Sequence, residues 1–167
     1  MKCDHGISVI ELLTVIAILA VLAFFTMPQI DSWMGKRKFR NGFEQLYNSL
    51  TILKGEAFGK NTTMRAELKK SNDGYIILSY QSQSDTITPD CSASGPWKNL
   101  PEQQLRIGNA IISSPPNICF YRDGTAEPAE YTLESTKYGQ YKIAVHSATG
   151  FMERLKKNKK TNTWDEP

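Results

Sequence analysis

One carboxylate stands inside a long apolar stretch near the start of the chain. Residues 7–30 are almost entirely apolar, and Glu11 is their only ionisable member. A carboxylate in hydrocarbon costs a few kcal/mol on insertion scales, so such a residue is a candidate for a functional role. The alternative is that Glu11 lies near the surface of the lipid and is solvated there.

The apolar run has the length of a membrane-spanning helix, for which roughly 20 residues are needed. It is longer than the apolar core of an ordinary secretory signal, about 7–15 residues, and no A-x-A pattern follows it. Any cut must therefore come before the run, after Gly6. This predicts a leader at residues 1–6 and a transmembrane helix at residues 7–30.

The segment around this cut resembles a known processing signal. Residues 6–13, Gly-Ile-Ser-Val-Ile-Glu-Leu-Leu, are similar to the class III signal of type IV pilins and type II secretion pseudopilins. The resemblance implies that a prepilin peptidase cuts after Gly6 and methylates the amino group of Ile7, where phenylalanine or methionine is commoner. The family has a glutamate as fifth mature residue and often a proline as the twenty-second, which match Glu11 and Pro28.

The function that this resemblance implies is assembly. In a filament, the methylated amine of Ile7 on a neighbouring subunit would be the partner of Glu11. The processed chain would wait in the bacterial inner membrane as a single-pass protein, with its C-terminal domain in the periplasm. The basic residues at 36–40 would favour the opposite orientation under the positive-inside rule, but the peptidase signature requires the leader in the cytoplasm.

An amphipathic pattern continues beyond the apolar run. Trp33 fits an interfacial aromatic residue, and apolar residues then recur at spacings of four and three. This pattern predicts that the helix continues over residues 31–60 with one face against a globular partner. Pro28 is expected to kink or loosen the helix, and Gly59 to end it. The stripe consists of Phe39, Phe43, Leu46, Leu50, Leu53 and Ala57.

Residues 61–155 have the pattern of a β-rich domain, and residues 81–101 are expected to form a long loop. The fold class is therefore α+β, with a long N-terminal transmembrane helix packed on a C-terminal antiparallel β-sheet domain. Strands are expected at about residues 64–68, 74–80, 105–112, 117–121, 130–133, 141–146 and 151–155.

The second half of the β-rich region extends the resemblance. Residues 117–124, 131–133 and 141–145, followed by Gly150, are similar to the C-terminal pattern of the GspH/FimT-type minor pilins. That pattern is a strand, a glycine turn, a strand and a final hairpin. The likeness covers most of residues 7–155.

Cys3 lies in the expected leader and would be lost on cleavage, which leaves two cysteines in the mature chain. Cys91 and Cys119 are an even number in a domain that the resemblance places outside the cytoplasm, where an oxidising environment favours a disulfide. Two separate buried thiols are the alternative.

Positive charge gathers after the last expected strand, around a basic tail at residues 156–167. Lysines there could contact phosphates, and a tryptophan could stack on a base. Some FimT-type pilins bind DNA through a G-R-x-R motif, but residues 150–154 read Gly-Phe-Met-Glu-Arg, without the arginine pair. A solvated tail is the alternative. The candidate DNA-binding residues are Arg154, Lys156, Lys157, Lys159, Lys160 and Trp164.

Other chemistry has little support in the sequence. The net charge of +3 names no partner by itself. There is neither a phosphate-binding loop nor a nucleophile elbow. His146, expected to be a strand residue, and two distant cysteines do not make a metal site. We therefore expect no enzymatic activity, cofactor or metal.

These patterns together predict a minor pilin-like subunit that assembles into a type IV pilus or a related filament. A minor pseudopilin of the type II secretion system and a DNA-binding minor pilin for DNA uptake in natural transformation are the alternatives. The expected partners are other pilin or pseudopilin subunits, a prepilin peptidase, the inner membrane and, weakly and without sequence preference, DNA.

Overall fold

The computed structural model describes residues 8–70, 75–83, 91, 97–106, 110–113 and 117–167, without the side chains of residues 24–29, 75–77 and 83. The chain divides into two compact units, Met1–Lys36 and Arg37–Pro167. We refer to them as the N-terminal unit and the C-terminal unit. The boundary falls after Lys36, later than the division at residue 30 that the sequence suggests.

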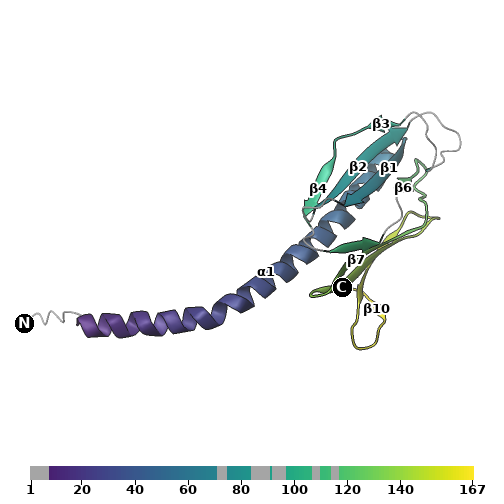
Figure 1. Ribbon diagram of the computed structural model, residues 1–167. Helices are drawn as coiled ribbons and strands as arrows, with labels where there is room; N and C mark the ends of the chain where they lie inside the picture. Colours follow the sequence, from purple (N-terminus) through teal and green to yellow (C-terminus); the bar gives the residue numbers. More distant parts are fainter. Residues whose placement is uncertain (1–7, 71–74, 84–90, 92–96, 107–109, 114–116) are drawn as a thin grey trace, which may run out of the picture. The chain divides into compact units, whose positions relative to one another are not determined.

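One long helix, α1, runs from Val9 to Gly59 and is continuous through Pro28 (Figure 1). Its end is fixed by a hydrogen bond of 3.0 Å from the Thr62 N–H to the Ala57 carbonyl. Asn61 lies between them in the left-handed region, with φ of 51°. This is the usual helix-ending motif, in which asparagine can replace glycine. The expected continuation of the helix to about Gly59 is therefore confirmed.

The expected transmembrane character of this helix is wrong. Within the described part of the chain, no helix is both long enough and apolar enough to cross a membrane. The described residues of this helix include the carboxylate of Glu11 near its start and charged residues from Asp31 onward, and a charge is costly in hydrocarbon. The long helix and the antiparallel strands of the expected fold are present.

Ten strands follow α1 in the described residues and form two antiparallel sheets (Figure 1). The first sheet has the order β3-β2-β1-β6, with β4 also paired to β2, and the second has the order β10-β9-β8-β7-β5. The strands are β1 Thr63–Lys70, β2 Tyr75–Gln83, β3 Lys98–Asn99, β4 Gln103–Arg106, β5 Ile111–Ser113, β6 Asn117–Phe120, β7 Ala129–Ser135, β8 Gly139–Val145, β9 Met152–Lys157 and β10 Trp164–Asp165.

The sheets are built from both near and distant pairings. In the first sheet, Ala66 of β1 lies opposite Tyr80 of β2 on one side and Ile118 of β6 on the other. In the second sheet, Tyr131 of β7 lies opposite Ile143 of β8. The single strand expected at residues 105–112 is instead two short strands, β4 and β5, which belong to different sheets.

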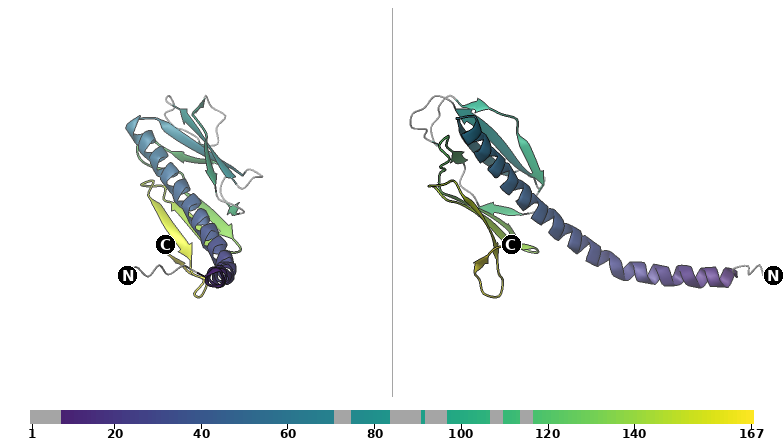
Figure 2. Two further views of the ribbon diagram at one scale, coloured as in Figure 1. Left: turned by 90° about the vertical axis from the view of Figure 1, so that its left-hand side faces the viewer. Right: turned by 180° about the vertical axis from the view of Figure 1, so that it is seen from behind.

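The C-terminal part of α1 runs along both sheets and shares one core with them (Figure 2). Its aromatic residues meet the second sheet, with the ring centre of Tyr141 5.0 Å from that of Phe43 and 5.6 Å from that of Phe39. Burying each large apolar side chain contributes about 1.5–3 kcal/mol. The predicted stripe is confirmed, since all six members are buried: Phe39, Phe43, Leu46, Leu50, Leu53 and Ala57.

Candidate assembly surface and basic hairpin

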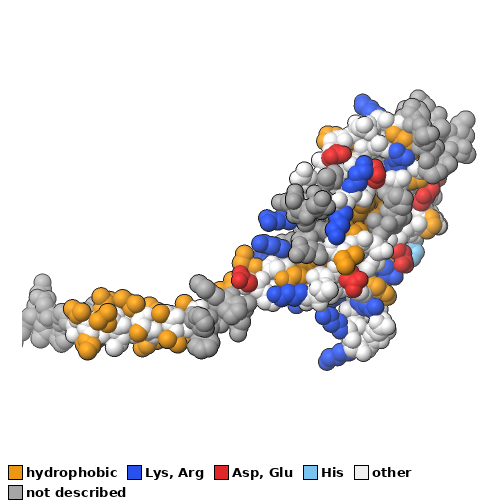
Figure 3. All heavy atoms as spheres, viewed as in Figure 1, with side chains coloured by type: hydrophobic (Ala, Val, Ile, Leu, Met, Phe, Trp, Pro, Cys, Tyr) orange, Lys and Arg blue, Asp and Glu red, His pale blue; other side chains and the backbone are white. Residues whose placement is uncertain are grey.

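The first part of α1 carries large apolar side chains that are exposed all around the helix. Val9 is 75% exposed, and Val15, the least exposed of the group, is still 48% exposed. Figure 3 shows hydrophobic side chains along the visible face of this segment. A surface this apolar marks a site for association in folded proteins. We call it the apolar surface; its residues are Val9, Ile10, Leu12, Leu13, Val15, Ile16, Ile18, Leu19, Val21 and Leu22.

Glu11 lies in the first turn of α1, next to Ser8 at the start of the helix. The Ser8 carbonyl accepts hydrogen bonds from the N–H groups of Glu11 and Leu12, at 3.0 and 3.1 Å. The carboxylate therefore faces the positive end of the helix dipole, which favours it by about 0.3–1 kcal/mol. The pattern Ser8-Val9-Ile10-Glu11 is that of a capping box. This pattern is visible in the sequence.

Three residues of the proposed processing and assembly signal have no described side-chain environment. Gly6 and Ile7 lie outside the described residues, and only the helical backbone is described at Pro28. Their roles stay predictions that rest on the resemblance.

A disulfide joins Cys91 to Cys119, with a Cα–Cα distance of 5.7 Å. Cys119 lies on β6 and is fully buried, and Cys91 is 3% exposed. The guanidinium of Arg65 donates to the Cys91 carbonyl at 3.0 Å and lies over the Trp97 ring, 4.3 Å from its centre. The disulfide and Arg65 together fasten Cys91 and Trp97 to the first sheet.

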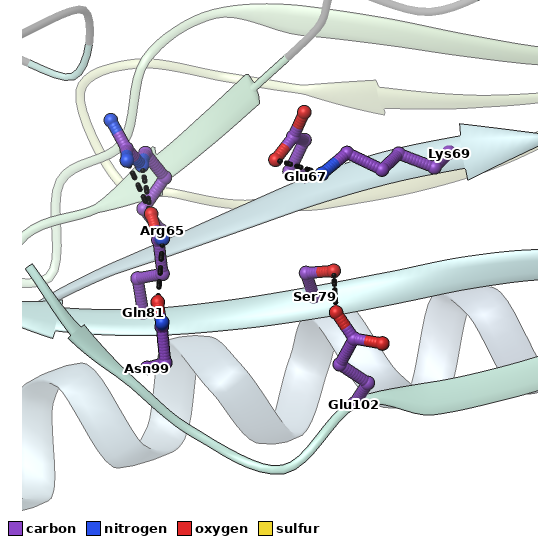
Figure 4. Close-up of polar contacts among 7 residues, drawn as sticks. All are labelled: Arg65, Glu67, Lys69, Ser79, Gln81, Asn99 and Glu102. Atoms are coloured by element: carbon purple, nitrogen blue, oxygen red, sulfur yellow. Dashed lines mark hydrogen bonds and ion pairs between the residues drawn. The ribbon is translucent and has the colours of Figure 1, made fainter.

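Arg65 also begins a row of polar contacts across three strands, which Figure 4 shows. Its Nε donates to Oε1 of Gln81 at 2.8 Å, and Nε2 of Gln81 donates to Oδ1 of Asn99 at 2.8 Å. The row links β1, β2 and β3 side by side. Its residues therefore tie the three strands together.

The basic tail is folded and does not trail as a solvated end. Its first residues, Lys156 and Lys157, belong to β9, and they pair with Asp165 and Trp164 of β10. The Asn158 N–H donates to the Thr163 carbonyl at 2.9 Å, closing the turn between the strands. We call this element, residues 152–165, the basic hairpin.

Four lysines of the basic hairpin border a hollow of about 440 Å³ beside the turn that precedes β8. Tyr138 and Gln140 line its other side. Figure 3 shows lysine or arginine side chains at the tip of this hairpin, at the bottom of the view. Asp165 and Glu166 also border the hollow and offset part of its charge. The lysines are Lys156, Lys157, Lys159 and Lys160.

Two other candidate DNA contacts already have partners within the protein. Arg154 pairs with Glu44 of α1 at 2.9 Å and lies over the Tyr47 ring, 4.8 Å from its centre. The Trp164 ring has Lys142 at 4.8 Å and Lys157 at 5.9 Å from its centre. Arg154 therefore ties β9 to α1, and the structure gathers only the four lysines into one open surface.

His146, Tyr80 and Tyr131 are further titratable groups of the C-terminal unit. His146 stacks on the exposed Phe151 ring at 5.9 Å and lies 3.7 Å from Glu153. Burial raises the pKa of Tyr131 and of Tyr80, so neither phenol can act as a base near neutral pH. Among the residues that the structure describes, no group of three or more His, Cys, Asp or Glu side chains could hold a metal ion.

No family model matches the chain, and neither the curated proteins nor the solved structures compared with it gave a match.

Proposed function

We propose that the chain is a minor pilin-like subunit that assembles into a type IV pilus or a related filament through its N-terminal helix. The observation that supports this most is the apolar surface, ten large apolar residues each about half or more exposed. A helix that is apolar on all sides needs neighbours on all sides. One flat contact would leave most of it in water, whereas a bundle of copies would cover it.

The C-terminal unit has the properties of the outward-facing part of such a subunit. It has a buried apolar core of its own. The Cys91–Cys119 disulfide suits an oxidising compartment, because cytosolic thiols are kept reduced. Both properties fit a domain displayed outside the cytoplasm.

Processing is the first step of the proposal. In cells with a prepilin peptidase and filament machinery, intact mass should show the loss of residues 1–6 and a methyl group on Ile7, and the product should appear in the sheared filament fraction. Gly6→Val should block the cut, because a branched side chain does not fit a site that takes a hydrogen. A mature chain that retains residues 1–6, or one that is cut but absent from every filament fraction, would refute the proposal.

Glu11 is proposed to act in recruitment, opposite the methylated amine of Ile7 on a neighbouring copy. Glu11→Ala should leave the cut intact and lower the share of the chain in the filament fraction. Glu11→Gln keeps the size of the side chain and removes its charge, so it tests the charge alone. Normal incorporation of both variants would show that the carboxylate has no part in assembly.

A second candidate function is weak DNA binding, which the lysine-lined hollow of the basic hairpin favours. Four lysines neutralising phosphates of duplex DNA would give a log–log salt slope of about −3 to −4, since each contributes about −0.9. Reversing the charge of Lys156, Lys157, Lys159 and Lys160 should abolish retardation in a low-salt gel shift. Arg154→Ala is the matched control, since Arg154 is paired with Glu44. Retardation unchanged by the lysine reversals would remove this candidate.

A further inference from the structure

Three elements meet at one end of the C-terminal unit. Strand β8 and the turn before it lie against the start of this unit's helical segment, because the ring centre of Phe39 is 6.1 Å from that of Tyr138 and 5.6 Å from that of Tyr141. Tyr138 also borders the hollow beside the basic hairpin. The start of the helical segment, the turn and the basic hairpin therefore stand at the same end of one folded unit.

Each of these elements contributes cations to this end. Lys38 and Arg40 are exposed near the start of the helical segment. Burial raises the pKa of Tyr141 and the positive charge of Arg40 opposes this rise, so the guanidinium lies near that phenol. Lys137 is exposed in the turn, with its Nζ 5.7 Å from the centre of the Tyr138 ring. We call this surface the basic end; its residues are Lys38, Arg40, Lys137, Lys156, Lys157, Lys159 and Lys160.

The lysines of the basic hairpin continue the surface that the helical segment begins. Tyr141 of β8, which Arg40 approaches, lies opposite Lys156 of β9. Figure 3 shows lysine or arginine side chains along this lower end of the unit, as far as the tip of the hairpin. Against the seven cations of the basic end stand the two carboxylates that border the hollow, Asp165 and Glu166. The basic end therefore keeps a clear excess of positive charge.

Such a surface is complementary to a plane of phosphate groups. Each lysine or arginine close to an anionic membrane surface raises the affinity for it about fivefold. The cations come from three elements and are spread over the end of the unit, which suits a plane better than the single line of a duplex backbone. Trp33 and Met34, both exposed, directly precede the unit in the chain. An exposed tryptophan is typical of the interface between lipid and water.

We propose that the basic end docks the C-terminal unit onto an anionic phospholipid surface, with its lysine and arginine side chains contacting the lipid phosphates. Docking of this kind needs no helix that crosses the membrane. The inference goes beyond the proposed function, because assembly uses the apolar surface of the N-terminal unit and docking uses the C-terminal unit. A docked subunit stays at the membrane until a filament takes it up, and lipid and DNA compete for the lysines of the basic hairpin.

Flotation of the purified full chain with vesicles tests the docking. One set of vesicles is phosphatidylcholine, and the other is phosphatidylcholine and phosphatidylglycerol in equal parts. The apolar surface meets hydrocarbon in both sets, so the excess of binding to the acidic vesicles reports the charge contacts. We expect a clear excess at low salt that falls as salt is added, because salt screens exposed charges. Equal binding to the two sets at low salt would overturn the docking.

Charge-neutralising substitutions locate the contact. Lys38→Gln/Arg40→Gln/Lys137→Gln should lower the excess by about tenfold or more, since each lost cation costs about fivefold. This variant keeps all four hairpin lysines that the DNA candidate uses. Because Arg40 lies near the core, Lys137→Gln/Lys159→Gln/Lys160→Gln is a second variant with the same expected loss, and its three changes all lie in turns. An excess that neither variant lowers would overturn the docking.

The matched control removes three exposed cations from the other end of the same unit. Lys60 lies just beyond the end of α1, about 30 Å along the helix from Arg40 at 1.5 Å per residue. Lys98 and Arg122 belong to segments beside that end of the helix. Lys60→Gln/Lys98→Gln/Arg122→Gln should float as the native chain does. A loss in the control equal to that in the basic-end variants would show a general effect of net charge and overturn the assignment.

The outcomes separate docking from DNA binding and from assembly. If the acidic vesicles bind no excess while the hairpin lysines still retard DNA in a gel shift, the basic end belongs to nucleic acid and the docking is overturned. A chain that floats through these charges but never enters a filament supports the docking and removes the proposed function. Entry into filaments without an excess on acidic vesicles overturns the docking alone.

Discussion

The two ends of α1 show opposite uses of apolar residues within one helix. Between Phe39 and Ala57 a stripe of six apolar side chains follows one face and is buried against the two sheets. From Val9 to Leu22 they occupy every side, and all are exposed. Both segments are helical, but only the stripe from Phe39 to Ala57 is buried within its own unit.

This difference shows how apolar residues can serve stability or association. A stripe along one face satisfies its burial within the fold, and its loss weakens the fold. A segment that is exposed and apolar on all sides is not buried by its own fold, and its apolar surface is removed from water only by association with other molecules. Substitutions in the two segments should therefore change different measured quantities.

The largest expected effect is on the stability of the C-terminal unit. Phe43 is fully buried and contacts Tyr141. Phe43→Ala should therefore lower the free energy of unfolding by about 3–5 kcal/mol. Ile18→Ala, in the exposed segment, should change that free energy by no more than about 0.5 kcal/mol. Urea unfolding followed by near-ultraviolet circular dichroism measures both. Similar losses in the two variants would remove the distinction between the segments.

Next in size is the disulfide, which belongs to the C-terminal unit alone. Closing a loop across the 28-residue separation of Cys91 and Cys119 stabilises the fold, by about 3–4 kcal/mol in the chain-entropy model. Cys91→Ala/Cys119→Ala should lose most of this free energy, whereas Cys3→Ser should lose none. Unfolding curves of the two variants under non-reducing conditions give the comparison. An unchanged midpoint in the double variant would show that the cross-link does not hold the sheet.

The smallest expected effect comes from Asp123, in the turn between β6 and β7. Hydrogen bonds from the hydroxyl and N–H of Thr125 lower the pKa of Asp123. A carboxyl with a lowered folded pKa adds stability above its unfolded pKa, and that stability is lost as the pH falls through the folded pKa. Asp123→Asn should thus be slightly less stable than the native chain at pH 7 and equal to it near pH 2. A difference that persists in acid would assign the effect to something other than the charge.

The helix and most strands could be predicted because their signals are local. Spacings of three and four identified the buried stripe, and short runs of branched and aromatic residues located most of the strands. The division into two sheets could not be predicted. Nothing near Leu105 and Ile111 indicates that β4 pairs with β2 while β5 pairs with β7, because pairing partners are chosen by the whole fold.

The candidate sites were predictable to different degrees. The sequence identified Cys91 and Cys119 as the pair left after the leader, and the structure joins them. It also identified the lysines at 156–160, but not the hairpin that gathers them, because β10 is only two residues long. The partner of Arg154 is Glu44, 110 residues away, so sequence spacing gives no sign of it. The membrane-spanning helix was predicted from the length of the apolar run and from the resemblance, and no helix in the described residues is long and apolar enough to cross a membrane.

The most direct test of the account compares two matched pairs of substitutions by sedimentation velocity of the purified full chain. Ile18→Asp/Leu22→Asp places charges in the apolar surface, at residues 60% and 56% exposed. Ile52→Asp/Phe58→Asp does the same in the C-terminal unit, at residues 63% and 66% exposed. We expect the native chain and the second variant to sediment as assemblies and the first variant as a monomer. Assemblies of equal size in all three proteins would contradict the assignment of the apolar surface to association.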